Sequence, residues 1–187
     1  MRHVKGFSLV ELVVVILLIG ILSAVAVPRL FSSTDKAHRA AIQSLQSQMG
    51  STLNVIAGEW LLNGSQRPYV IDGLAYNMSQ FGYPDVTVVA AALPAGLVAA
   101  PSGTSDACKQ FLVRVVGLPE GLVGVQPDAA AGTTAVDLNV GKTWIAEFTG
   151  AKCVYHYNAG LTASITYMPN ERFAVMADGI YSRLKFK

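Results

Sequence analysis

The stretch that decides the fold is KGFSLVELVVVILLIGILSAVAVP, which occupies residues 5–28. From Phe7 to Val27 the only charged residue is Glu11, and the only other residues that are not hydrophobic are Ser8, Gly20 and Ser23. As an α-helix this run would extend about 31 Å, close to the thickness of the hydrocarbon core of a bilayer. The run therefore predicts a membrane-spanning helix at the N-terminus.

The length fits one domain with a hydrophobic core, and the composition is unusually apolar. The chain has 187 residues, of which 52% are hydrophobic and 14% charged, whereas soluble domains carry roughly 25% charged residues. Arg2 and Lys5 are two of the 14 basic residues, so 12 basic and 12 acidic residues remain after position 6. This balance argues against nucleic-acid binding, which needs clustered Lys and Arg.

Two general explanations of the N-terminus are incomplete. An ordinary signal peptide would use Arg2 and Lys5 as its charged region and Ala24-Val25-Ala26 as its cleavage site, but its apolar run is usually about 7–15 residues. A plain membrane anchor explains the length of the run but not Glu11. A carboxylate inside a span costs about 2.5–3.5 kcal/mol on insertion scales.

The segment Lys5–Leu12, with the apolar run after it, resembles the N-terminus of type IV pilins and of type II secretion pseudopilins. In that family a short basic leader ends in Gly, and a membrane peptidase cuts after it and methylates the new N-terminus. The resemblance implies a leader of residues 1–6, cleavage between Gly6 and Phe7, and N-methylation of Phe7. It also implies a precursor in the inner membrane that is later assembled into an extracellular filament on the bacterial surface.

The resemblance assigns roles within the apolar run as well. Glu11 becomes the fifth residue of the mature chain, where the family keeps a Glu used in assembly, and Pro28 matches a helix-distorting Pro. Residues 7–28 are then the transmembrane and filament-core helix, and residues 29–187 form the globular domain. The implied partners are other pilin subunits, the prepilin peptidase and the inner-membrane assembly platform. Since Pro28 has no backbone N–H, a kink or local loss of helix is expected there.

Helical periodicity continues beyond this segment. Apolar residues recur at steps of three and four, which predicts a helix face packed on the globular domain: Ile42, Leu45, Met49, Leu53, Ile56 and Trp60. The opposite face carries uncharged residues only: Gln43, Gln46, Ser47, Gly50, Ser51 and Asn54. Such a face is either a contact with neighbouring subunits or simply polar and exposed. The helix should end near Asn63-Gly64.

The remainder predicts a sheet. Residues 65–105 look irregular, and Val86–Ala92 fits a strand or a short helix. Ser105 or Asp106 should cap a helix through Cys108 to Val116, and Leu118–Thr134 is predicted to be a loop. Strands and a hairpin at Asp178-Gly179 follow: Lys142–Phe148, Cys153–Tyr157, Leu161–Met168, Arg172–Met176 and Ile180–Phe186. The fold class is therefore α+β, a long N-terminal helix on an antiparallel sheet, as in the pilin fold.

The chain has two cysteines, Cys108 and Cys153. In an exported domain the simplest arrangement is one disulfide between them. Closing that loop would stabilise the fold by about 4 kcal/mol on the loop-entropy model. The enclosed loop is either a structural element alone or, as in many pilins, a surface recognition region.

No pattern predicts catalysis, a metal or a cofactor. His3, His38 and His156 are far apart in sequence and lack the spacing of metal ligands. Nucleophile, phosphate-loop and zinc-protease motifs are absent from the sequence. The sequence therefore predicts a protein that is not an enzyme.

Two segments refine the family resemblance. Asn77–Val88, with Phe81-Gly82-Tyr83-Pro84, and Cys153–Tyr157 are similar to mannose-sensitive haemagglutinin (MSHA-type) pilins, which implies surface attachment. The alternatives are a type II secretion pseudopilin and a minor pilin that binds a ligand such as DNA. The cysteine pair favours the pilus over the pseudopilin, and the balanced charge argues against DNA.

Overall fold

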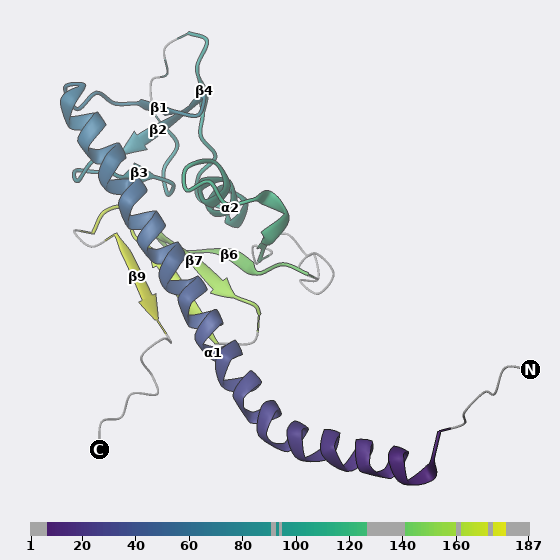
Figure 1. Ribbon diagram of the computed structural model, residues 1–187. Coiled ribbons are helices and arrows are strands. Elements are labelled where there is room, and N and C mark those ends of the chain that lie inside the picture. Colours follow the sequence, from purple (N-terminus) through teal and green to yellow (C-terminus); the bar gives the residue numbers. More distant parts are fainter. Residues whose placement is uncertain are drawn as a thin grey trace, which may run out of the picture. The chain divides into compact units, whose positions relative to one another are not determined.

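The computed structural model describes residues 7–90, 93, 95–126, 141–159, 162–171 and 174–178. The chain divides into two compact units, one ending at His38 and the other beginning at Arg39. Helix α1, Leu9–Leu62, starts in the first unit and ends in the second (Figure 1).

The first unit is the N-terminal half of α1. The carbonyl oxygen of Ser8 accepts a hydrogen bond from the backbone N–H of Leu12 at 3.2 Å, so the helix begins directly after Ser8. The backbone stays helical through Pro28, and of the two outcomes expected there, local loss of helix is not observed. Among the residues that the structure describes, no helix is long and apolar enough to cross a membrane.

The second half of α1 packs on the globular unit as its periodicity predicts. All six apolar residues of the stripe from Ile42 to Trp60 are at most 7% exposed. On the other face Gln43, Ser47 and Asn54 are exposed. The helix ends at Leu62, followed by Gly64 at φ +76°, which confirms the predicted end.

A small sheet follows in the region predicted to be irregular. Strand β2 pairs antiparallel with β1 and β3 and parallel with β4. These strands have two to five residues each, too few to show an alternating pattern: β1 Tyr69–Ile71, β2 Leu74–Met78, β3 Pro84–Asp85 and β4 Val98–Ala99. The prediction of an irregular segment is therefore corrected. The described part of Val86–Ala92 is neither strand nor helix.

Helix α2, Ser105–Arg114, confirms the predicted short helix but not its cap. Thr104 is the cap, because its Oγ1 accepts a hydrogen bond from the N–H of Ala107 at 3.1 Å. Ser105 instead accepts from the N–H of Phe148 at 3.0 Å. The Ser105 hydroxyl, which the sequence offered as a cap, therefore makes a long-range hydrogen bond to Phe148 instead.

The predicted loop after Leu118 is also corrected. It contains a short 3₁₀ helix η1, Glu120–Leu122, and strand β5, Val123–Val125. Strand β5 is parallel to β6, and Val123 is 1% exposed. Its strand character comes from this pairing rather than from a local pattern. Residues 127–134 of the predicted loop lie outside the described residues.

The main sheet has the order β5-β6-β7-β8-β9. Its last four strands are antiparallel neighbours and match the predicted strands to within about three residues: β6 Trp144–Thr149, β7 Lys152–Tyr157, β8 Ala163–Tyr167 and β9 Val175–Asp178. The α+β pilin architecture is confirmed. The predicted turn residue Gly179 and the strand Ile180–Phe186 lie outside the described residues.

The core of this unit lies on one face of the main sheet. Cross-strand partners Ala146, Tyr155 and Ile165 are all fully buried and belong to the same cluster as the α1 stripe. Phe111 of α2 stacks on Tyr167, with ring centroids 4.5 Å apart. One continuous core therefore joins α1, α2 and the sheet.

The segment Phe81-Gly82-Tyr83-Pro84 docks on the end of α1 through its glycine. Gly82 has φ +78°, and a Cβ there would lie 2.7 Å from Cε3 of Trp60 and 3.2 Å from Cα of Ala57. A residue with a side chain would meet both the backbone strain and the helix. Gly82 is thus a close-packing position.

We predict that Gly82→Ala destabilises the protein, by about 1–3 kcal/mol more than Gly117→Ala, because the added methyl overpacks the contact with α1. Gly117 is the matched control, since its φ is +84° and nothing lies within 4 Å of the place that an added methyl would take. Urea unfolding of the full chain in detergent, followed by tryptophan fluorescence, measures both. Equal losses for the two variants would contradict the packing role.

Candidate functional site: the N-terminal helix and the disulfide

From Leu9 to Leu22, helix α1 exposes apolar side chains on every side. Leu9, Leu17 and Leu22 are 77%, 60% and 69% exposed, and the large apolar residues between them are all at least 40% exposed. A helix that is hydrophobic all round is normally buried, and apolar surface of this extent marks an interaction site. The segment from Leu9 to Leu22 is therefore an interaction surface.

Glu11 lies within this apolar surface. It is in the first turn of α1, where the helix dipole favours a negative charge. Its neighbours Val10 and Leu12 are 68% and 57% exposed. When the surrounding side chains are covered, the carboxylate loses water and needs a cationic partner.

Of the residues to which the sequence assigned roles in processing and assembly, Phe7, Glu11 and Pro28 lie in the described part of the chain. Phe7 precedes Glu11 by about one helical turn and is 77% exposed. Pro28 lies inside α1, and Gly6 lies outside the described residues. Cleavage, methylation and assembly at these positions stay predictions.

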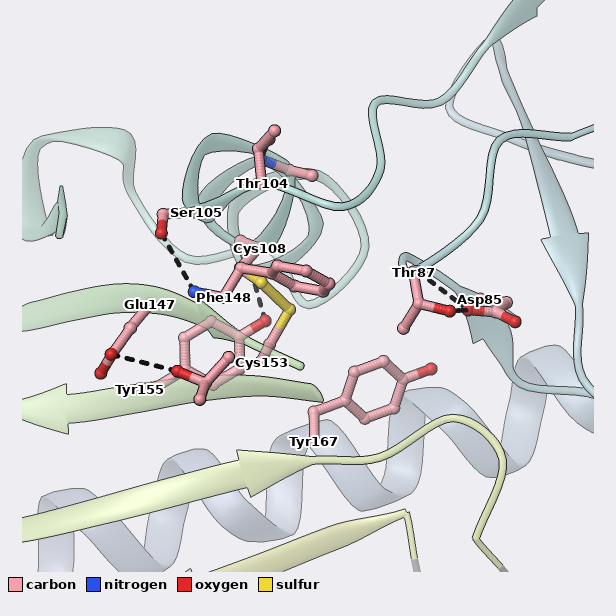
Figure 2. Close-up of a disulfide and its surroundings, with 12 residues drawn as sticks. Asp85, Thr87, Thr104, Ser105, Cys108, Glu147, Phe148, Cys153, Tyr155 and Tyr167 are labelled. Carbon is pink, nitrogen blue, oxygen red and sulfur yellow. Dashed lines mark hydrogen bonds between the residues drawn. A yellow bond between two sulfur atoms is a disulfide. The ribbon is translucent and has the colours of Figure 1, made fainter. Parts of the chain in front are cut away.

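Cys108 and Cys153 form a disulfide with a Cα–Cα distance of 5.6 Å. It joins α2 to β7, and both cysteines are fully buried. Figure 2 shows it beneath α2, against the rings of Tyr155 and Tyr167. This bond belongs to the core and offers no surface by itself, while residues 127–140 of the enclosed loop are outside the described residues.

Hydrogen bonds around the disulfide hold α2 on the sheet. The hydroxyl of Tyr155 donates to the carbonyl of Cys108 at 3.1 Å, and the N–H of Phe148 donates to Ser105 Oγ (Figure 2). The hydroxyl of Tyr167 donates to the carbonyl of Pro84 at 2.6 Å. Burial raises the pKa of both tyrosines well above the ordinary value, so they stay neutral donors at physiological pH.

Other polar groups do not assemble a reactive site. Nε2 of His156 lies 2.7 Å from Oε2 of Glu147, in a half-exposed pair on neighbouring strands. Asp85, only 5% exposed, accepts from the N–H and the Oγ1 of Thr87 at 2.9 and 2.6 Å (Figure 2). In the described part of the chain, no three His, Cys, Asp or Glu side chains are grouped as a metal would require. Sequence reasoning missed buried Asp85, although an Asp two residues before Thr is a recognisable turn signal.

We predict that Cys108→Ser lowers the free energy of unfolding by about 2–5 kcal/mol, because the unfolded chain gains freedom and the core keeps an unpaired thiol. Denaturant unfolding under non-reducing conditions measures the change. The double variant Cys108→Ser/Cys153→Ser should be destabilised similarly. A non-reducing peptide map should link the two cysteines in the parent protein, and free thiols at both positions would contradict the bond.

Two comparisons with known proteins gave a match. Residues 1–27 match the family described as "Prokaryotic N-terminal methylation motif". The chain is also 47% identical over 47 residues to the type IV narrow pilus major component PilA5 of Thermus thermophilus, which covers 25% of this chain. The chain spans 40% of the length of that relative. No solved structure matches the chain.

The family match falls on the part of the chain where the fold shows an exposed apolar helix with one acid in its first turn. The helix and the following sheet have the pilin arrangement. The chain therefore carries the prokaryotic N-terminal methylation motif and is similar over part of its length to the subunit of a type IV pilus.

Proposed function

We propose that this protein is the subunit of a type IV pilus, held together by the first half of α1. The observation that carries the proposal is the long apolar surface of that helix, exposed on all sides and interrupted by Glu11. Copies of the same helix are a suitable cover, because apolar helices of adjacent subunits remove each other's surface from water. A filament repeats that contact along its axis.

Cleavage and methylation of the precursor precede the contact between helices. The peptidase cuts the leader of residues 1–6 after Gly6 and leaves Phe7 as a methylated N-terminus. Before assembly, residues 7–28 hold the precursor in the inner membrane, as the apolar run of the sequence favours. The assembly platform then moves the subunit into the filament, with residues 29–187 on the outside as the globular domain.

Glu11 sets the axial position of each subunit. Cleavage creates a positive amine at Phe7, and methylation preserves its charge. In the apolar centre of the filament, the amine of one subunit pairs with Glu11 of a neighbour, since an unpaired buried charge costs several kcal/mol. An apolar helix alone permits many offsets, so this pair selects one. Pro28, inside the helix, stays a proposed assembly residue through its missing backbone N–H.

The uncharged face of α1 extends the proposed contact toward the globular unit. Gln43, Ser47 and Asn54 are exposed in the single chain, and no charge occurs between Ala40 and Gly58. Uncharged polar groups lose less on desolvation than charged ones. This half of the helix therefore suits a second row of subunit contacts.

The finer proposal is a pilus that serves surface attachment, like MSHA-type pilins. It is supported by the similarity of Asn77–Val88, whose Gly82 docks on α1, and by that of Cys153–Tyr157. The relative PilA5 is described as the major component of a narrow pilus, which favours a filament over a secretion pseudopilus. A pseudopilin is the alternative, because it shares the N-terminal segment.

Cleavage is tested on the mature chain. We expect Phe7 as the first residue, carrying one methyl group, because the basic hexapeptide ends in Gly. N-terminal sequencing and intact mass measure this. A mature chain that begins at Val27 would identify an ordinary signal peptide instead.

Glu11→Val should be inserted and cleaved, because it is more hydrophobic, but it should not polymerise efficiently. Glu11→Gln removes only the charge and should show the same loss, since the amide does not neutralise the buried amine. Mature subunit is followed by immunoblot and filaments by shearing and electron microscopy.

The matched control for this pair is Asp35→Asn, an exposed acid farther along α1. It should keep the normal filament yield. A normal yield from Glu11→Val or Glu11→Gln would exclude the assembly role of the carboxylate.

A deletion strain separates the pilus from the pseudopilus. Cells that lack the gene should lose surface filaments and attachment while secreting exoproteins normally. Retained filaments together with blocked exoprotein secretion would identify a pseudopilin.

A further inference from the structure

A polar cavity of about 470 Å³ lies on the solvent side of α2. One wall is a single face of that helix, and the opposite walls come from the turn between β1 and β2 and from η1. The lining residues are Asp72, Asp106, Lys109, Gln110, Val113, Arg114 and Glu120. The volume is within the range of roughly 300–1,000 Å³ found for small-molecule sites.

The walls are held in place from behind. The disulfide at Cys108 and the buried ring of Phe111 fix the opposite face of α2. Asp72 sits in a tight turn at φ +48°, followed by Gly73 at φ +74°. The Nζ of Lys142 donates to the carbonyl of Gly121 at 3.0 Å and restrains η1. The helix that forms one wall of the cavity is therefore tied to the core of the unit.

Charges of both signs alternate around it. Lys109 Nζ lies 2.9 Å from Glu120 Oε1, and Arg114 Nη1 lies 3.3 Å from Asp72 Oδ2. Gln110 donates to Asp106 at 2.7 Å. Each cation of α2 thus faces a carboxylate on the opposing wall or beside it.

The alternation of carboxylates and cations around the cavity disfavours the binding of charged polymers. A polyanion would meet Asp72, Asp106 and Glu120, and a polycation would meet Lys109 and Arg114. Either would have to break existing ion pairs. A neutral hydroxyl, in contrast, donates to one carboxylate oxygen while it accepts from an ammonium or a guanidinium N–H.

The paired groups retain capacity for such contacts. A guanidinium has five N–H donors and a carboxylate has about four lone-pair sites, and each ion pair in the cavity uses one contact per partner. Val113 adds an apolar surface for a ring's C–H groups. We propose that this cavity binds a neutral saccharide of about one or two rings through adjacent hydroxyl groups.

The test uses the full chain in a zwitterionic amine-oxide detergent that carries no sugar, so it does not require filaments. Lactose is the neutral probe, the disaccharide of glucosamine the cationic probe and that of galacturonic acid the anionic probe. Saturation-transfer NMR detects weak binding, and we expect transfer to lactose with a dissociation constant in the range of about 1 mM. Stronger transfer to either charged probe than to lactose would overturn the proposal, as would no transfer to lactose.

Two cavity variants locate the site. Gln110→Ala and Arg114→Ala should each weaken lactose binding by about tenfold, because each removes hydrogen-bond donors to a hydroxyl. The matched control is Gln43→Ala, an exposed glutamine of α1, which should bind as the parent does. Thermal unfolding by circular dichroism checks that every variant is folded. Unchanged binding in both cavity variants, or an equal loss in the control, would place the saccharide elsewhere and overturn the proposal.

Discussion

Burial of one apolar stripe on the second half of α1 is the constraint on which the globular unit depends. The stripe from Ile42 to Trp60 is at most 7% exposed, and both sheets and α2 contribute to the same core. A sheet with one uncovered apolar face is not stable by itself, so it needs such a helix. Glycine at position 82 lets the Phe81–Pro84 segment approach that helix closely.

The disulfide and the buried tyrosines connect α2 and the main sheet to segments that are distant in sequence. Cys108 and Cys153 tie α2 to β7, while Tyr155 and Tyr167 use their hydroxyls on backbone carbonyls from distant segments. Burial also raises the pKa of Tyr76 to about 12. Neutral hydroxyls inside an apolar core satisfy acceptors that would otherwise be costly. The disulfide and the Tyr155 hydrogen bond hold α2, which forms one wall of the cavity, on the main sheet.

Helix α1 buries its apolar side chains in one part and exposes them in another. In its second half the stripe from Ile42 to Trp60 is buried in the globular unit, whereas the large apolar residues from Leu9 to Leu22 are exposed. An exposed apolar surface of this extent marks a site of interaction with a protein or a membrane, and the proposed filament supplies copies of the same helix as its cover. Glu11 is the one charge between Phe7 and Val27, and that stretch lies within the segment that matches the N-terminal methylation motif.

The sequence by itself determined the parts that depend on local pattern. The helix stripe, the end of α1 near Gly64, the helix of Cys108 and the four antiparallel strands follow from periodicity and turn residues, because each signal lies within a short window. The N-terminal family motif is likewise one continuous segment. Only the tertiary structure decided the cap at Thr104, the parallel strand β5 and the strands β1–β4. It also decided the cavity, where Arg114 pairs with Asp72 at a sequence separation of 42 and Lys109 pairs with Glu120 at a separation of 11. These features depend on contacts between distant residues, and no local pattern records which distant residues will meet.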